Sequence, residues 1–67
     1  MKLRDLTEQE AAKMSDDPDA RYIKKTYGEG SNSLWYELNN KYLEIYVTTD
    51  SSCWVIGGAE YDKIEKE

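Results

Sequence analysis

The chain carries few side chains that could perform covalent chemistry. Its 67 residues include no histidine, which excludes serine–histidine and cysteine–histidine nucleophiles and any histidine-ligated zinc site. The single cysteine, Cys53, cannot form a thiolate metal site alone, and it excludes a disulfide within the chain. Its acidic neighbours also disfavour the thiolate form that a reactive cysteine needs. We therefore expect no enzymatic activity, no catalytic residue and no cofactor.

Three aspartates, Asp16, Asp17 and Asp19, could contribute carboxylate ligands to a divalent cation. The segment lacks the spaced acids and the glycine of an EF-hand loop. Asp17 is better explained as the N-cap of a helix, and Asp19 suits the positive end of a helix dipole. We therefore expect these aspartates to have a structural role and the chain to have no metal site.

A two-residue turn organises the stretch LWYELNNKYLEIYVT, residues 34–48. Asn39 and Asn40 lie between two runs of strand-forming residues, and asparagine tolerates the positive φ that a tight hairpin turn requires. This turn pairs residue 38 with 41, 36 with 43 and 34 with 45. One face of the hairpin is then mostly aliphatic and is expected to be the core face. Its residues are Leu34, Tyr36, Leu38, Leu43, Ile45 and Val47, with Lys41 at the rim.

The other face of this hairpin is the strongest candidate binding surface. A solvated strand face normally carries Thr, Lys, Glu and Ser, whereas this one combines aromatic rings with two glutamates. Trp and Tyr give large, rigid contacts and are enriched at binding hot spots. The ordinary alternative is that aromatics favour strands and form stabilising cross-strand pairs, and the C-terminal tail could also fold over this face. The candidate partner-binding residues are Trp35, Glu37, Tyr42, Glu44 and Tyr46.

Two helices are expected before this hairpin. The first runs over about 8–14 and begins at a capping box formed by Thr7 and Glu10. The second runs over about 18–27, because Asp17 is a good N-cap, a proline follows it, and a glycine comes directly after the segment. A strand is the competing interpretation of RYIKKTY within this second segment, but the capping residues favour the helix.

A third strand is expected over 52–57, SCWVIG, after a turn centred on Asp50-Ser51. That turn places Trp54 and Ile56 in the core, whereas a three-residue loop would place them outside. Residues 59–67 are rich in charge and form a C-terminal tail.

These elements predict one α+β domain spanning residues 1–67. Two short N-terminal helices pack on a three-stranded antiparallel β-meander, followed by the charged C-terminal tail. The strands cover about 33–38, 41–48 and 52–57. A small sheet with one hydrophobic face needs such a helical cover.

The distribution of charge bears on possible partners. The net charge is −5, and residues 28–67 hold three bases against eight acids. An acidic domain repels phosphate backbones, so direct nucleic-acid binding is disfavoured. No stretch approaches the ~18 apolar residues of a membrane span, and the start lacks the apolar run of a signal peptide. A cytoplasmic location is therefore expected.

These observations favour a small acidic, non-enzymatic protein-binding module that acts as an inhibitor or regulator. Its acidic and aromatic sheet face would dock on a basic partner surface, such as that of a nucleic-acid-binding protein. In size and acidity the chain is similar in type to small accessory proteins of phages and mobile elements, although no motif carries this likeness. The alternative is a nucleic-acid-associated protein that uses the basic face of the second helix, with Arg21, Lys24 and Lys25.

Self-association is also expected. In a three-stranded sheet the strands over 33–38 and 52–57 are edges, and they carry one charge and none, respectively. Such edges are weakly protected against pairing with another chain. A homodimer through the sheet, by edge pairing or by face packing, is therefore predicted.

Overall fold

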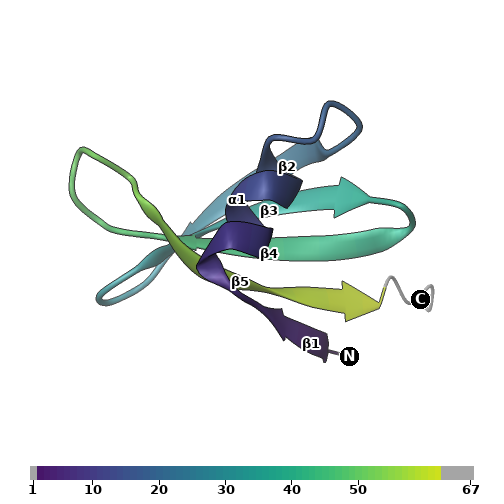
Figure 1. Ribbon diagram of the computed structural model, residues 1–67. Coiled ribbons are helices and arrows are strands. Elements are labelled where there is room, and N and C mark those ends of the chain that lie inside the picture. Colours follow the sequence, from purple (N-terminus) through teal and green to yellow (C-terminus); the bar gives the residue numbers. More distant parts are fainter. Residues whose placement is uncertain (1, 63–67) are drawn as a thin grey trace.

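A five-stranded antiparallel sheet with one helix on one of its faces makes up the structure (Figure 1). The computed structural model describes residues 2–62. In chain order the elements are β1 (Lys2–Leu6), α1 (Glu8–Ser15), β2 (Arg21–Tyr27), β3 (Asn32–Leu38), β4 (Lys41–Val47) and β5 (Val55–Asp62). The strand order in the sheet is β1-β5-β4-β3-β2, so the first strand pairs with the last. In this part of the chain, α1 is the sole helix, and it is neither long nor apolar enough to span a membrane.

The predicted capping box at the start of α1 is confirmed. The Thr7 hydroxyl accepts a hydrogen bond from the Glu10 N–H at 3.1 Å, and the Glu10 carboxylate accepts one from the Thr7 N–H at 3.0 Å. Both bonds satisfy backbone donors that have no partner inside the helix. The Thr7 N–H and the Arg4 guanidinium lower the pKa of the Glu10 carboxyl. The short sequence TEQE thus fixes where this helix begins.

The predicted hairpin of β3 and β4 is also confirmed, including its register. Leu38 pairs with Lys41, Tyr36 with Leu43 and Leu34 with Ile45. Asn39 and Asn40 form the connection with φ of 55° and 64°. Two consecutive positive φ values characterise the type I′ turn, whose twist matches that of the flanking strands.

Substitutions at Asn40 should report on this turn. Asn40→Ala is expected to destabilise the protein by about 1 kcal/mol, because alanine pays a steric penalty at positive φ that asparagine tolerates better. Asn40→Gly should not destabilise it, since glycine is the preferred second residue of such a turn. Urea unfolding followed by circular dichroism measures both changes. Equal losses for the two variants would contradict this account of the turn.

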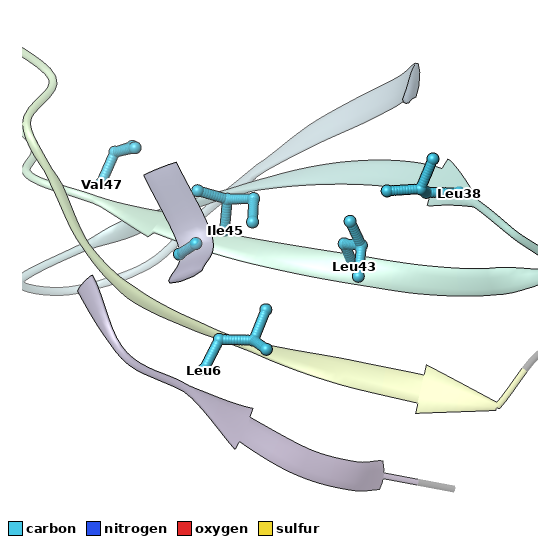
Figure 2. Packing of buried hydrophobic residues seen from close by; sticks show 6 residues of the cluster. Leu6, Leu38, Leu43, Ile45 and Val47 are labelled. Atoms are coloured by element: carbon cyan, nitrogen blue, oxygen red, sulfur yellow. The ribbon is translucent and has the colours of Figure 1, made fainter. Parts of the chain in front are cut away.

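The core lies between α1 and the sheet. Figure 2 shows Leu43, Ile45 and Val47 following one another along β4, and each is at most 1% exposed. Ala11 of the helix is fully buried against them. The complete cluster is Leu6, Ala11, Leu38, Leu43, Ile45 and Val47, with Met14, Ala20, Leu34, Tyr36 and Val55 partly buried around it.

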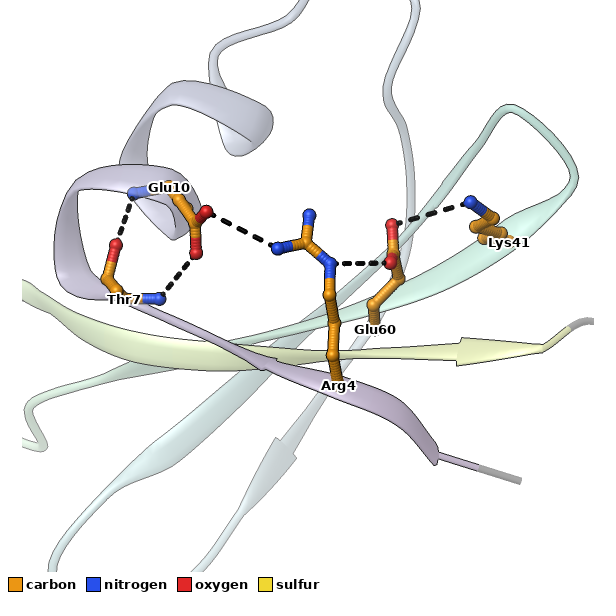
Figure 3. Close-up of polar contacts among 5 residues, drawn as sticks. All are labelled: Arg4, Thr7, Glu10, Lys41 and Glu60. Carbon is orange, nitrogen blue, oxygen red and sulfur yellow. Dashed lines mark hydrogen bonds and ion pairs between the residues drawn. The ribbon is translucent and has the colours of Figure 1, made fainter.

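An ion-pair chain ties β1 to β5 beside this core (Figure 3). Glu60 is 7% exposed, and its carboxylate lies 3.0 Å from Arg4 Nε and 3.9 Å from Lys41 Nζ. Arg4 also contacts Glu10 at 3.3 Å, which links the sheet to the capping box. A carboxylate this deeply buried needs such partners, because its desolvation is otherwise costly.

The predicted helix over 18–27 is wrong, because residues 21–27 form strand β2 against β3. Asp17 is not an N-cap. Its carboxylate accepts the Asp19 N–H at 2.8 Å, and its carbonyl accepts the Ala20 N–H at 3.0 Å, so the segment turns. β3 offers a row of backbone donors and acceptors that an adjacent strand can satisfy. The β-branched and aromatic residues of RYIKKTY suit that strand, so tertiary pairing outweighs the local capping signals.

The three-stranded meander and the charged tail are wrong as well. The sheet gains β1 and β2, and β5 continues to Asp62 through residues assigned to the tail. Residues 63–67 of that tail lie outside the described part of the chain. The strands expected at the edges, β3 and β5, are interior, and the edges are β1 and β2. Edge pairing of β3 or β5 in a homodimer therefore has no basis in this fold.

The predicted core positions of Trp54 and Ile56 are wrong too. Trp54 is 69% exposed and Ile56 is 48% exposed. β4 ends at Val47 and β5 begins at Val55, so the connection is longer than a two-residue turn. A register shift follows between Tyr46 and Val47, and Val55 packs against the core instead. Trp54 therefore lies in the loop, and Ile56 is the extra residue at the register shift, so neither side chain reaches the core.

Candidate functional site

The face of the sheet opposite α1, called the open face below, is the candidate site. Residues paired across neighbouring strands share a face, so the register defines its rows of side chains. The central row is Lys24, Trp35, Glu44 and Ala59; one flanking row is Arg21, Glu37, Tyr42 and Tyr61, and the other is Thr26, Ser33, Tyr46 and Gly57.

The five predicted partner-binding residues lie together on the open face. Trp35 pairs with Glu44, Glu37 pairs with Tyr42, and Tyr46 pairs with Ser33. All five are half-buried. Their placement on one face follows from the hairpin register alone. Their role in binding a partner stays a prediction.

Glu44 lies at the centre of a hydroxyl network on this face. Its carboxylate accepts hydrogen bonds from Ser33 Oγ at 2.7 Å, Tyr61 Oη at 2.8 Å and Tyr46 Oη at 3.3 Å. The bond to Glu44 is the main cause that raises the pKa of the Tyr61 hydroxyl. Burial raises the pKa of the Tyr46 hydroxyl, and the charge of Glu44 raises it further. Both tyrosines therefore remain hydrogen-bond donors to this carboxylate, which fixes the positions of their rings.

Trp35 is held from several sides. Its ring lies 5.5 Å from the Tyr61 ring, with 38° between the two planes. Its indole N–H donates to Thr26 Oγ1 at 3.0 Å, and the Lys24 ammonium lies 5.9 Å from the ring centre. An indole fixed in this way loses little conformational entropy when a partner covers it.

A shallow groove of about 340 Å³ lies beside Trp35, between β2 and β4. A bulge in β2 between Tyr22 and Lys24 adds Ile23 to the groove wall. The groove is lined by Ile23, Lys24, Trp35 and Tyr42. It can accept one apolar side chain, with an ammonium group at its rim.

Tyr61, Ile23 and Lys24 also belong to this site, although none of them is among the five predicted partner-binding residues. Tyr61 lies in the predicted C-terminal tail, yet in β5 it follows Gly57 and Ala59 at every second position, so the three residues share one face of the sheet. That alternation was a usable signal. Ile23 reaches the groove only through the bulge, which no residue type in the segment marks.

The two glutamates of the open face are engaged within the protein. Glu37 lies 3.1 Å from the Arg21 guanidinium, and Glu44 accepts the three hydroxyls described above. The open face is therefore mainly aromatic in character. Most of the acidic surplus lies elsewhere on the molecule.

The described acidic residues, Cys53 and the basic residues of β2 are not arranged as the metal-binding, nucleophilic or nucleic-acid-binding sites considered from the sequence. Within residues 2–62, no three acidic or cysteine side chains are grouped so that they could hold a metal ion. Cys53 is exposed, and its thiol contacts the Asp50 carbonyl oxygen at 3.6 Å. Arg21, Lys24 and Lys25 lie on β2, so the helical basic face on which the nucleic-acid alternative rested does not form.

No family model matches this chain, and neither a curated protein nor a solved structure matches it significantly.

Proposed function

We propose that this protein is a non-enzymatic protein-binding module, an inhibitor or regulator, whose open face docks on a basic surface of another protein. One observation carries the proposal. Trp35, Tyr42, Tyr46 and Tyr61 share the sheet face that lies opposite α1, and hydrogen bonds to Glu44 fix two of them.

The chemistry of these side chains suits protein recognition. Trp and Tyr are enriched among the few residues that carry most of the binding energy at interfaces. A network that already orders the rings in the free protein lowers the entropic cost of binding. Two of the rings are tyrosines whose hydroxyls bond to Glu44, so the face is both apolar and polar across short distances. Such a mixture is typical of interface anchors.

Charge supports a basic partner. The net charge of −5 attracts a positively charged surface over long range and speeds encounter. At contact, a lysine or arginine of the partner can lie on an aromatic ring of the open face. Lys24 already occupies this kind of position above Trp35, at 5.9 Å from the ring centre. Rings that accept one cation within the chain can accept others from a partner.

Two tryptophan variants test the proposal: one changes the open face, and the other is a control that changes the β4–β5 loop. Trp35→Ala removes the centre of the open face, whereas Trp54→Ala removes a tryptophan that is 69% exposed in the β4–β5 loop. A partner captured from a host lysate by the wild type should bind the purified Trp35→Ala variant at least ~30-fold more weakly, as expected for a hot-spot residue. The Trp54→Ala variant should bind within a few-fold of wild type. Circular dichroism establishes that each variant is folded.

Equal affinity of all three proteins for that partner would overturn the role of the open face. A homodimer through face packing is a competing use of the same surface. Light scattering over a tenfold range of concentration separates the two uses, because a mass that stays near 7.8 kDa leaves the face free.

A further inference from the structure

β2 forms an exposed edge of the sheet. It pairs with β3 on one side, and no strand within residues 2–62 lies on its other side. α1 packs on β5, β4 and β1, near the opposite edge of the sheet. Six of the seven residues of β2 are exposed. Edge strands of this kind present unpaired backbone N–H and C=O groups that another extended chain can pair with.

The side chains of β2 give this edge a strong charge. Arg21, Lys24 and Lys25 are its three bases, and the strand contains no acid. Arg21 is paired with Glu37 of β3, so the two lysines are the bases on which the edge depends for attraction. Lys24 pairs with Trp35 on the open face, whereas Lys25 pairs with Leu34 on the helix face. Positive charge therefore flanks the edge on both faces of the sheet. The rest of the chain is acidic, so the basic character is local.

This charge decides what can pair with the edge. A second copy of β2 would place lysine and arginine side chains opposite one another, and like charges in cross-strand pairs are destabilising. An acidic strand would place carboxylates beside both lysines. The other edge, β1, has its cations paired within the chain, Lys2 with Asp5 and Arg4 with Glu60. It therefore offers no comparable attraction.

The groove adds a specific contact. Ile23 in the bulge of β2 lines it together with Trp35 and Tyr42. A strand lying along β2 would pass this groove, and one apolar side chain pointing to the open face could enter it. The bulge limits regular pairing to the stretch from Lys24 to Tyr27, whose residues are in continuous register with β3.

We propose that the free edge of β2 binds an extended acidic peptide segment of another protein, which adds to the sheet as a further strand. Backbone hydrogen bonds from Lys24–Tyr27 hold the segment, Lys24 and Lys25 select acidic side chains, and the groove takes one apolar side chain. A single-stranded nucleic acid could use the charges, but it could not use the strand edge, and the net charge of −5 repels it. The two proposed sites share Trp35 and Tyr42, but strand addition uses the backbone edge of β2, which the basic-partner contact does not use, so either proposal can fail without the other.

A labelled synthetic peptide with a leucine and two adjacent glutamates between strand-forming residues is the probe. Fluorescence anisotropy should show that the wild type binds it and that Lys24→Glu weakens binding by about tenfold, because an attractive cross-strand pair becomes repulsive. Lys13→Glu, an equal charge change on an exposed residue of α1, should have an effect of less than about twofold. Thermal unfolding verifies that both variants are folded.

Backbone methylation separates strand addition from attraction between charges. N-methyl groups on alternate peptide residues remove the N–H donors along one edge of the peptide and leave its charge unchanged. One of the two alternate sets should abolish binding, and peptide addition should slow hydrogen exchange of amides in β2. The proposal is overturned if both methylated peptides bind as well as the parent peptide. It is also overturned if no peptide binds, or if a single-stranded oligonucleotide binds with equal affinity.

Discussion

Replacing Ile45 by alanine is expected to unfold a large part of the protein population at room temperature. Ile45 is fully buried in the middle of β4, between α1 and the sheet. Truncating such a residue costs about 2–5 kcal/mol, from lost burial and from the cavity that remains. A chain of this length has a free energy of unfolding of about 3–10 kcal/mol. The loss is therefore comparable with the whole stability.

The chain offers a matched control in Ile56, which is 48% exposed on β5. Ile56→Ala makes the same chemical change and should cost no more than about 1 kcal/mol. Urea unfolding followed by far-ultraviolet circular dichroism compares the two variants. If Ile45→Ala does not fold, Ile45→Val should still lose about 0.5–1.5 kcal/mol in a measurable range. A larger loss for Ile56→Ala than for Ile45→Ala would mean that the core has been assigned to the wrong face.

Replacing Gly58 by alanine is expected to destabilise the protein by about 3 kcal/mol, the upper part of the range for overpacking. Gly58 lies in β5, paired with Ile45. A Cβ at this position would lie 2.5 Å from the backbone carbonyl oxygen of Glu44 and 3.4 Å from the Cβ of Ala11. The closest neighbour is backbone within the β4–β5 pair, so it cannot move aside as a flexible side chain would. The close approach of the β4 backbone is therefore the main reason why glycine is needed here, and Ala11 of α1 packs next to the same position.

Gly30→Ala provides the comparison for Gly58→Ala. Gly30 has a φ of 88°, and a Cβ there would meet no atom within 4 Å. Alanine should therefore cost only about 1 kcal/mol at Gly30, from its unfavourable backbone conformation. Thermal and urea unfolding give both values. If Gly58→Ala proves no more destabilising than Gly30→Ala, the close approach of the β4 backbone to Gly58 is not what requires glycine.

The candidate site was predictable in so far as it depends on one hairpin. Asn39 and Asn40 set the turn, and side-chain alternation then placed Trp35, Glu44 and Tyr46 on one face. The partners that hold these residues come from distant strands. Tyr61 reaches Glu44 from β5, and Thr26 reaches Trp35 from β2. Neither contact follows from local spacing, because each requires a strand in a segment where the local pattern predicts a helix or a tail.

By itself, the sequence determined the features whose interacting groups lie within a few residues of each other. The capping box that begins α1 spans Thr7 to Glu10, and the β3–β4 turn spans Leu38 to Lys41. Their energetics depend on local backbone geometry and hydrogen bonds, so residue types at fixed spacing were sufficient. The exclusion of histidine-dependent chemistry likewise needs only composition.

Tertiary structure alone decided the outer strands of the sheet. β1 pairs with β5 across nearly the whole chain, with Leu6 opposite Gly58, and no local pattern encodes that pairing. Residues 21–27 carry local signals for both helix and strand. They form a strand because they pair with the backbone of β3. Long-range pairing satisfies many backbone groups at once, whereas a helix cap contributes only about 1 kcal/mol. The larger, non-local contribution therefore prevailed over the local one.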